Sequence, residues 1–297
     1  MIDRHLNAIA TDLGVTLDEA GALVGSMSGS HVHAVTRADQ TPAILKITTG
    51  AGGPTREAAE RELHVYLDIG NQLGIRLPEL LDHRETDDAI AVLLTAHPAP
   101  RPAGSWTHDQ WLLLADDLAR LHQTPVPTGH EWRRHSWLAA ILHTPDVGTT
   151  QAFWSRPGEP ELLAPILADP QALYQPIDLT TDCFLHGDCH TDNILIEQHQ
   201  LIWTDWQAAG AAKPVADLAF PASRAMPDGV DVPQQDMIAR YAAARGLDAT
   251  ELSRAVLAAE LAILIFAWPE YAAHQTELGI QRIHDRLQPL ASSWLDG

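Results

Sequence analysis

Three polar residues between positions 183 and 206 have the types and the order of a centre that transfers phosphoryl groups. Asp188 is followed five residues later by Asn193, and Asp205 comes after two short apolar runs. An amide oxygen and a carboxylate are hard ligands that suit Mg²⁺, which keeps water and phosphate oxygens as its other ligands. A further carboxylate can orient an attacking hydroxyl and accept its proton. Catalysis of phosphoryl transfer depends mostly on such positioning and on charge neutralisation.

The two apolar runs predict the element that positions these groups. Residues 194–197 and 201–204 read as short strands separated by three polar residues. Folded as a hairpin, they bring the residue before the first strand beside the residue after the second. We therefore expect Asn193 and Asp205 to lie side by side, with Asp188 facing the same space from one loop earlier.

A zinc site is an alternative interpretation of the same segment. His186, Asp188, His190 and Asp192 are metal-ligating types, and the two histidines are four residues apart. Gly187 disfavours a helix between them, and the Glu of an HExxH pair is absent. The phosphoryl-transfer interpretation is therefore preferred.

The first third of the chain predicts a small mixed domain. The patterns indicate helices at 2–13, 17–24 and 55–69, a hairpin of 31–36 and 42–47 with a Gly/Ser-rich turn, and strands at 77–81 and 89–95. In the helix over 55–69, Leu63, Tyr66 and Leu67 mark the predicted apolar side.

The remainder predicts a mainly helical domain behind a proline-rich hinge. Pro98, Pro100 and Pro102 form a segment that cannot be helical. A core-facing stripe follows at helical spacing, formed by Trp111, Leu114, Leu118 and Leu121. We expect an irregular loop over 146–160 and helices over 233–245, 250–268 and 274–290. The domain boundary is placed between residues 96 and 97.

Composition limits the partners and the compartment. The 297 residues carry a net charge of -20, which disfavours nucleic acid and anionic membranes and favours cationic ligands. The most apolar run, 255–268, is interrupted by Glu260 and is too short to span a bilayer. With two cysteines and no signal-peptide core, the chain is expected to be cytoplasmic. Only two lysines are present, Lys46 and Lys213.

The chain resembles the aminoglycoside phosphotransferase and choline kinase family, whose fold is like that of protein kinases. The resemblance rests on His186-Gly187-Asp188 with Asn193, then Thr204-Asp205-Trp206, then Asp217-Leu218-Ala219, and on LARLHQTPVP at 118–127. It covers almost the whole length. It implies an α+β fold with two lobes, a nucleotide-binding sheet lobe over 1–96 and a larger, mainly helical catalytic and acceptor-binding lobe over 97–297.

The resemblance implies roles for the central residues. Asp188 resembles the catalytic base, Asn193 and Asp205 resemble the Mg²⁺ ligands, and Asp217 resembles an acid that braces the catalytic loop. Thr204 departs from the usual Ile or Val, and Lys213 stands where an Asp or another polar residue is common.

The nucleotide, ATP or GTP, would be held by the first lobe. Lys46 resembles the lysine that binds the α- and β-phosphates, and Glu60 resembles its glutamate partner, with Glu57 and Glu62 as competitors. The loop 25–30 would cover the phosphates, with Ser28, Gly29 and Ser30 as its named members. Backbone groups of Ala96 and Pro98 would bind the adenine edge.

The acceptor is expected to be a small hydroxylated cation. The acidic balance favours an antibiotic, either an aminoglycoside or a basic peptide of the viomycin or capreomycin type, so that the activity would confer resistance. Asp192 and Glu270 are candidate acids for binding it, and Trp268 and Tyr271 are candidate stacking surfaces. A metabolic kinase for choline, a sugar or an amino alcohol is the alternative. A non-catalytic kinase-like binding protein is disfavoured because the catalytic and metal-binding types are retained.

Overall fold

The computed structural model describes residues 4–17, 22–23, 29–50, 52–129, 132, 137–154 and 159–297. The chain forms two compact units, and each is described by itself below. Unit 1 comprises Met1–Ala99 and Leu195–Ala209, and unit 2 comprises Pro100–Ile194 and Gly210–Gly297. The first break lies inside the proline-rich segment. The sequence did not suggest that residues 195–209 belong to unit 1.

Unit 1 is built on a five-stranded antiparallel sheet with the order β1-β2-β3-β5-β4. The strands are β1 (Ala22–Leu23), β2 (Ser30–Thr36), β3 (Pro42–Thr49), β4 (Leu80–Glu85) and β5 (Ala89–Thr95). The β2–β3 hairpin confirms the predicted pairing, although the residues that connect these two strands are 37–41. The Gly/Ser-rich segment instead lies between β1 and β2.

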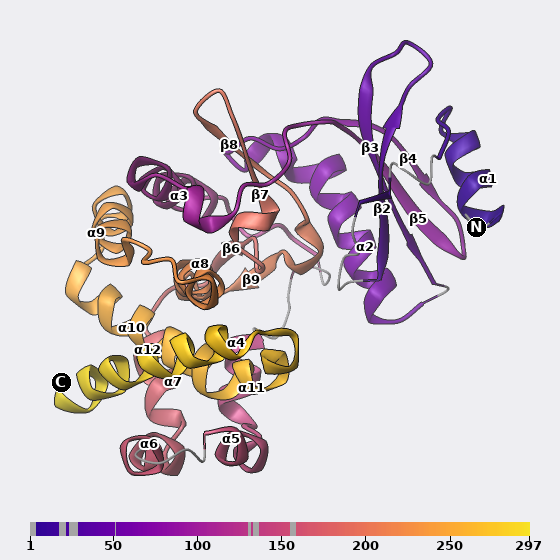
Figure 1. The fold of residues 1–297 in the computed structure, drawn as a ribbon. Helices are drawn as coiled ribbons and strands as arrows, with labels where there is room; N and C mark the ends of the chain where they lie inside the picture. The colour runs from indigo at the N-terminus through magenta and orange to yellow at the C-terminus, as the bar shows by residue number, and fades with distance from the viewer. Residues whose placement is uncertain are drawn as a thin grey trace. The chain divides into compact units, whose positions relative to one another are not determined.

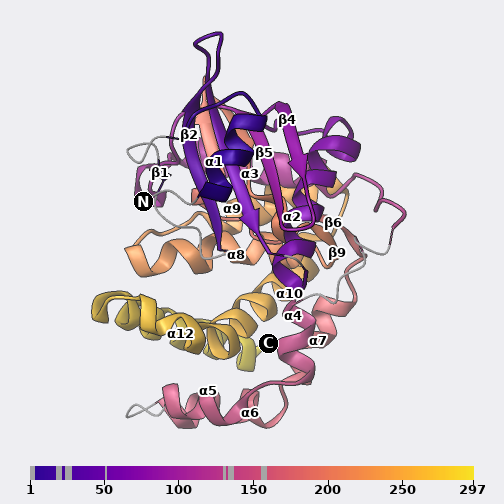
Figure 2. The ribbon, with the colours of Figure 1, turned by 90° about the vertical axis from the view of Figure 1, so that its right-hand side faces the viewer.

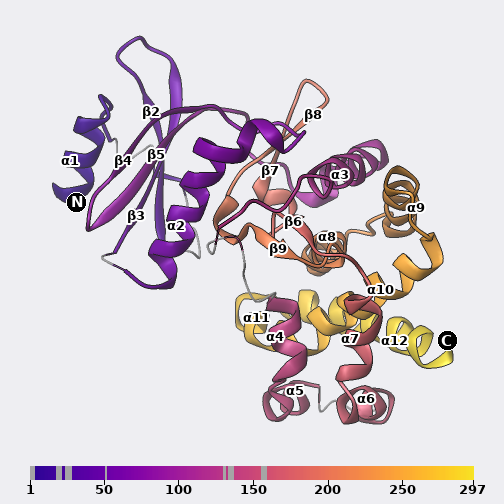
Figure 3. The ribbon, with the colours of Figure 1, turned by 180° about the vertical axis from the view of Figure 1, so that it is seen from behind.

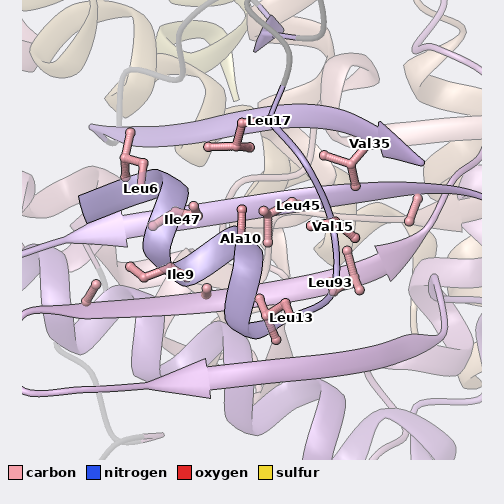
Figure 4. Close-up of a cluster of buried hydrophobic side chains, with 13 residues drawn as sticks. Leu6, Ile9, Ala10, Leu13, Val15, Leu17, Val35, Leu45, Ile47 and Leu93 are labelled. Carbon is pink, nitrogen blue, oxygen red and sulfur yellow. The ribbon is translucent and has the colours of Figure 1, made fainter. Parts of the chain in front are cut away.

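Helices cover both faces of this sheet, α1 (Arg4–Asp12) on one and α2 (Pro54–His64) on the other (Figures 1 and 3). Side chains of β5 alternate between them, because successive residues of a strand point to opposite faces. Ala89, Ala91 and Leu93 belong to the buried cluster that contains residues of α1. Figure 4 shows Leu93 beside α1 in this cluster. Ile90, Val92 and Leu94 pack with Ala59 and Leu63 of α2. Burial on both faces explains why this strand is a continuous apolar run.

Three sequence predictions in unit 1 were wrong in detail. The predicted helix over 17–24 contains strand β1. Strand β4 starts at Leu80, three residues later than predicted, and extends to Glu85. Helix α2 ends at His64 and continues as a π-helical turn over Val65–Ile69, in which Leu67 is 47% exposed.

The predicted hairpin is present and consists of β7 (Ile194–Glu197) and β8 (Gln200–Trp203). Gln198 and His199 connect the strands with φ angles of 48° and 65°. A two-residue hairpin turn with positive φ at both positions matches the twist of its strands. After β8 the chain passes Asp205 and forms a 3₁₀ turn over Trp206–Ala208.

Unit 2 is mainly helical around a short antiparallel pair, β6 (Cys183–Leu185) and β9 (Gly210–Ala212) (Figure 1). Its helices are α3 (His108–Leu121), α4 (Trp137–His143), α5 (Val147–Phe153), α6 (Glu159–Ala168), α7 (Gln171–Asp178), α8 (Val215–Ala225), α9 (Gln234–Arg245), α10 (Ala249–Ala262), α11 (Trp268–Tyr271) and α12 (Glu277–Asp296). Helix α10 packs against α7, α8 and α9, and α12 packs against α10 and α6 (Figure 2).

The predicted apolar stripe of α3 is confirmed, since all four of its residues are buried. Thr107 and Gln110 form a reciprocal capping box that starts this helix. The expected irregular loop over 146–160 was wrong, because it contains α5 and the start of α6. Residues 249–274 are long and apolar enough to cross a membrane, but 72% of the most apolar window is buried inside the protein, as in a core helix.

Candidate active site

Asp188 lies on a loop that directly follows β6 in unit 2. The side-chain amide of Asn193 donates hydrogen bonds of 2.9 Å to both the Asp188 main-chain oxygen and its carboxylate. Asn193 is placed by a 3₁₀ turn over Thr191–Asn193, in which the main-chain N–H of Asp192 lies 3.4 Å from His190 Nδ1. The two residues predicted as base and metal ligand are therefore joined in one small loop, and the Asn193 amide oxygen is directed away from Asp188.

Asp217 holds the start of this loop from α8. Its two carboxylate oxygens accept the main-chain N–H groups of His186 and Gly187, each at 2.9 Å. Gly187 has a φ of 82°, a left-handed conformation that glycine adopts without a Cβ clash. His122 Nε2 lies 3.2 Å from Asp217, and because a carboxylate only accepts, the imidazole N–H donates. The geometry confirms the predicted bracing role of Asp217.

His122 itself was missed as a support of the loop. It ends α3 within the LARLHQTPVP segment, and its other ring nitrogen contacts the Tyr241 hydroxyl at 2.8 Å. The Leu-His-x-x-Pro pattern was the available signal, although the sequence alone does not say that its histidine reaches Asp217.

The charge of Asp188 is stabilised by a neighbouring histidine. His190 Nε2 lies 3.5 Å from Asp188, and its Nδ1 lies 3.4 Å from Asp192. Burial lowers the pKa of His190, but the hydrogen bonds to the two carboxylates outweigh it and raise the pKa to about 9. Burial raises the pKa of Asp188, but the hydrogen bond and charge of His190, with His186 and Asn193, lower it to about 2. Asp188 is therefore an ionised carboxylate at neutral pH.

This arrangement disfavours the zinc alternative. Both ring nitrogens of His190 contact carboxylates, Nε2 that of Asp188 and Nδ1 that of Asp192, so neither is directed at a shared metal position. Within the described part of the chain, no group of three or more His, Cys, Asp or Glu side chains is arranged to hold a metal ion.

Lys46 lies at the centre of an ion cluster in unit 1. Its Nζ contacts the carboxylates of Glu62 at 2.7 Å and Asp205 at 2.8 Å. Burial lowers the pKa of Lys46, but the two carboxylates outweigh it and the net pKa is raised. Lys46 is therefore a buried, charged ammonium group on β3.

The predicted glutamate partner was wrong. Lys46 pairs with Glu62, whereas Glu60 contacts Arg56 at 2.7 Å and is 39% exposed. Ala59, Glu62, Leu63 and Tyr66 follow the i, i+3, i+4, i+7 spacing of one helix face, and Ala59 and Leu63 pack on the sheet. The resemblance of ERELHVYL to the family's helix pattern did not distinguish among the three glutamates of this helix. Of Glu57, Glu60 and Glu62, it is Glu62 that follows the phase of the packed face and contacts Lys46.

The predicted nucleotide-binding residues of the first unit are only partly described. Ser28 lies outside the described residues. Gly29 is exposed with a φ of 76°, and the buried Ser30 hydroxyl contacts Thr48 at 2.7 Å. Ala96 and Pro98 follow β5, half-buried and exposed respectively. Pro98 has no N–H and can offer only its carbonyl oxygen to a base. The nucleotide roles of these residues remain predictions.

The predicted acceptor residues have contrasting environments. Asp192 is exposed but lies between His190 and Arg224, the latter at 3.9 Å, so its charge is matched. Trp268 is buried and packs against Tyr271, so it does not offer the predicted stacking surface. Glu270 and Tyr271 are exposed. Their contact with an acceptor remains a prediction.

The predicted metal ligands have suitable chemistry for Mg²⁺. Asn193 offers an amide oxygen, and the Asp205 carboxylate keeps acceptor capacity beyond its bond to Lys46. When bound, the ion would neutralise charge on the phosphate oxygens. Asn193 and Asp205 belong to different units, so their joint binding of one ion remains a prediction.

Solved structures share the fold at low sequence identity. A microcompartment-associated aminopropanol kinase matches with a TM-score of 0.69 and 16% identity, covering 99% of this chain and 98% of its own. APH(2")-IIia in complex with GDP and kanamycin matches at 0.67 and 13%, covering 98% and 99%. The amicoumacin kinase hAmiN, in complex with AMP-PNP, Ca²⁺ and Ami, matches at 0.64 and 12%, covering 99% and 93%. No curated protein sequence matches the chain.

These likenesses establish the kinase-like, two-lobed α+β fold. The sequence itself matches the phosphotransferase enzyme family (APH) over residues 23–254, which contain the lysine cluster and the Asp188 loop. The chain therefore belongs to this phosphotransferase family and is a small-molecule phosphotransferase with an alcohol group as acceptor.

Proposed function

We propose that the protein transfers the γ-phosphate of ATP or GTP to a hydroxyl of a cationic antibiotic and thereby confers resistance. The candidate acceptors are aminoglycosides and basic peptides of the viomycin or capreomycin type. In this proposal Asp188 receives the hydroxyl, Lys46 paired with Glu62 binds phosphates, and Asn193 and Asp205 hold Mg²⁺. The reaction breaks the bond between the γ-phosphorus and the bridging oxygen of the nucleotide and forms a phosphate ester on the acceptor.

The geometry around Asp188 is the observation that carries the proposal: its carboxylate contacts the Asn193 amide at 2.9 Å and His190 Nε2 at 3.5 Å. The carboxylate is fixed by Asn193 and kept ionised by His190. It can therefore accept a hydrogen bond from a hydroxyl and aim the oxygen at phosphorus. With a pKa of about 2 it is a weak base, so it takes the proton late, when the oxygen has already lost electron density. That order suits the loose transition state of phosphoryl transfer.

The antibiotic class rests on charge and on two similar structures. A net charge of -20 attracts cations and repels anionic acceptors. The similar structures include a protein in complex with kanamycin and an amicoumacin kinase in complex with Ami. The second candidate, a metabolic kinase for choline, a sugar or an amino alcohol, is favoured by the likeness to an aminopropanol kinase.

An acceptor panel tests both candidates. The protein is incubated with Mg²⁺ and ATP or GTP, and mass spectrometry monitors the gain of one phosphate on aminoglycosides, viomycin, choline, neutral sugars and amino alcohols. Asp188→Asn should abolish transfer, while Asp169→Asn, which changes an exposed acid, should leave it unchanged. Turnover of a neutral sugar with failure of every cationic acceptor would exclude the antibiotic. If Asp188→Asn transfers phosphate as well as Asp169→Asn does, the role of Asp188 is excluded.

A further inference from the structure

Helix α2 buries two consecutive residues of opposite charge. Arg61 is 6% exposed and Glu62 is 3% exposed. Burying a charge is unfavourable unless it is paired and hydrogen-bonded. The charge of Glu62 is paired with Lys46, which also contacts Asp205, and Arg61 is not part of this ion cluster. The burial of Arg61 therefore indicates a different structural role.

Both residues hold the turn that follows Asp205. The carboxylate of Glu62 accepts the main-chain N–H of Trp206. The guanidinium of Arg61 donates to the main-chain oxygen of Gln207. The negative Glu62 thus accepts a main-chain N–H, and the positive Arg61 donates to a main-chain carbonyl. Each buried charge contacts a peptide group of opposite partial charge.

Asp205 is the residue whose conformation this turn sets. Its φ and ψ are 62° and 65°, a left-handed conformation that is unfavourable for a residue with a Cβ atom. Such a conformation persists where the surroundings fix the adjoining peptide groups. The N–H that Glu62 accepts belongs to the peptide group immediately after Asp205, and the Arg61 contact fixes the next part of the same turn.

The side chain of Gln207 attaches the turn to the sheet as well. Its amide nitrogen donates to the Ser30 hydroxyl at 3.2 Å, and Ser30 contacts Thr48 at 2.7 Å. Ser30 and Thr48 are paired residues of β2 and β3. Gln207 is itself buried. The turn is therefore held by α2 through its main chain and by the sheet through a side chain, all within unit 1.

We propose that Arg61 is a positioning residue for the divalent cation: through the Gln207 carbonyl it fixes the left-handed conformation in which Asp205 presents its carboxylate. The inference rests on the proposed role of Asp205 as a metal ligand. Arg61 touches neither metal nor nucleotide in this assignment. Substitution of Arg61 should therefore weaken the binding of Mg²⁺ in the presence of nucleotide, whereas nucleotide binding without metal should stay unchanged.

The test compares three variants of one helix. Arg61→Gln removes the charged donor, Arg61→Lys retains an ammonium group that can donate to Gln207, and Arg56→Gln is the matched control. Arg56 contacts Glu60 and the oxygen of Thr86 and makes no contact with the turn. Binding of AMP-PNP and of a GTP analogue is measured by calorimetry, without metal and along a Mg²⁺ titration. Thermal unfolding reports whether each variant is folded.

We expect the apparent Mg²⁺ dissociation constant to rise about tenfold in Arg61→Gln, equivalent to ~1.4 kcal/mol and near the value of a hydrogen bond from a charged donor. Arg61→Lys should show a smaller rise, and Arg56→Gln none. Unchanged Mg²⁺ dependence in a folded Arg61→Gln, or an equal weakening of metal-free binding, would overturn the inference. If Arg61→Gln does not fold, the same criteria apply to Arg61→Lys.

The outcome also separates this inference from the proposed function. If the wild-type protein binds Mg²⁺ and nucleotide and the Arg61 variants match it, only the positioning role fails. If the wild-type protein shows no Mg²⁺-dependent nucleotide binding, the proposed function fails and the role of Arg61 fails with it.

Discussion

Two single variants, Glu62→Gln and Glu60→Gln, measure how much each glutamate of α2 contributes to stability and to the binding of Lys46. The two substitutions remove the same charge from the same helix, two positions apart. Glu62 contacts Lys46 at 2.7 Å with a side chain that is 4% exposed, whereas Glu60 contacts Arg56 from a side chain that is 39% exposed. The pair therefore compares a buried ion contact with a surface one in a single local context.

The magnitudes follow from these environments. Breaking a buried ion pair costs about 3–5 kcal/mol when the remaining charge is left alone. Lys46 keeps Asp205 at 2.8 Å, so the loss falls to about 1.5–3 kcal/mol, the range of a hydrogen bond to a charged group. The exposed i,i+4 pair of Glu60 contributes only about 0.3–0.5 kcal/mol. Glu62→Gln should thus destabilise the protein at least threefold more than Glu60→Gln.

Urea unfolding followed by intrinsic fluorescence provides the stability assay, with the same slope m required in all three proteins. A loss of about 1.5–3 kcal/mol in binding the transition state would lower kcat/KM about 10- to 160-fold in Glu62→Gln. Glu60→Gln should remain close to wild type. Equal effects of the two substitutions, or a larger effect of Glu60→Gln, would refute the assignment of Glu62 as the lysine partner.

Three further outcomes are expected. Asp217→Asn should lower the free energy of unfolding in urea by about 1.5–3 kcal/mol and abolish most of the turnover. The reason is that an amide has one oxygen for the two N–H groups that the carboxylate accepts. A stability equal to that of the wild type would contradict this. Lys213→Met should lose about 1 kcal/mol with unchanged kcat, because Nζ donates to the Asp178 oxygen at the end of α7; a fall in kcat would indicate a catalytic role. Burial raises the pKa of Glu260 above 4.5, despite its contact with Arg286, so the folded state holds the proton more tightly. This contribution to stability is full below pH 4.5 and is lost as pH rises, so Glu260→Gln should gain melting temperature relative to wild type between pH 4 and 7; a constant difference would contradict the shift.

Much of the fold followed from local patterns, and the errors have physical causes. The stripe of α3 and the β7–β8 hairpin each depend on neighbours a few residues apart, so their periodicity was sufficient. The segment over 17–24 failed because strand β1 is defined by pairing with β2. Pairing with a distant segment leaves little trace in local sequence.

The site divides in the same way. The spacing of Asp188 and Asn193 within one loop predicted a contact that the structure contains. The partner of Lys46 was misassigned because it depends on which face of α2 packs on the sheet, and the family resemblance left three glutamates of that helix as candidates. Arg61 and Gln207 carried no sequence signal, since their contact joins positions 146 residues apart.

The electrostatics of the catalytic loop bear directly on the acceptor. Near Asp188, the carboxylates are already matched: His190 lies between Asp188 and Asp192, and Arg224 approaches Asp192. The surplus that produces a net charge of -20 is therefore contributed elsewhere in the chain. Attraction of a cationic acceptor would act over a distance and be screened by salt, whereas the choice of hydroxyl would depend on how the acceptor's other groups are held. Because Asp188 is a weak base, it would orient the attacking hydroxyl more than remove its proton. A hydroxyl that is not aligned with phosphorus would therefore react little faster. We therefore expect acceptor specificity to depend on the geometry of the bound acceptor more than on charge at this loop.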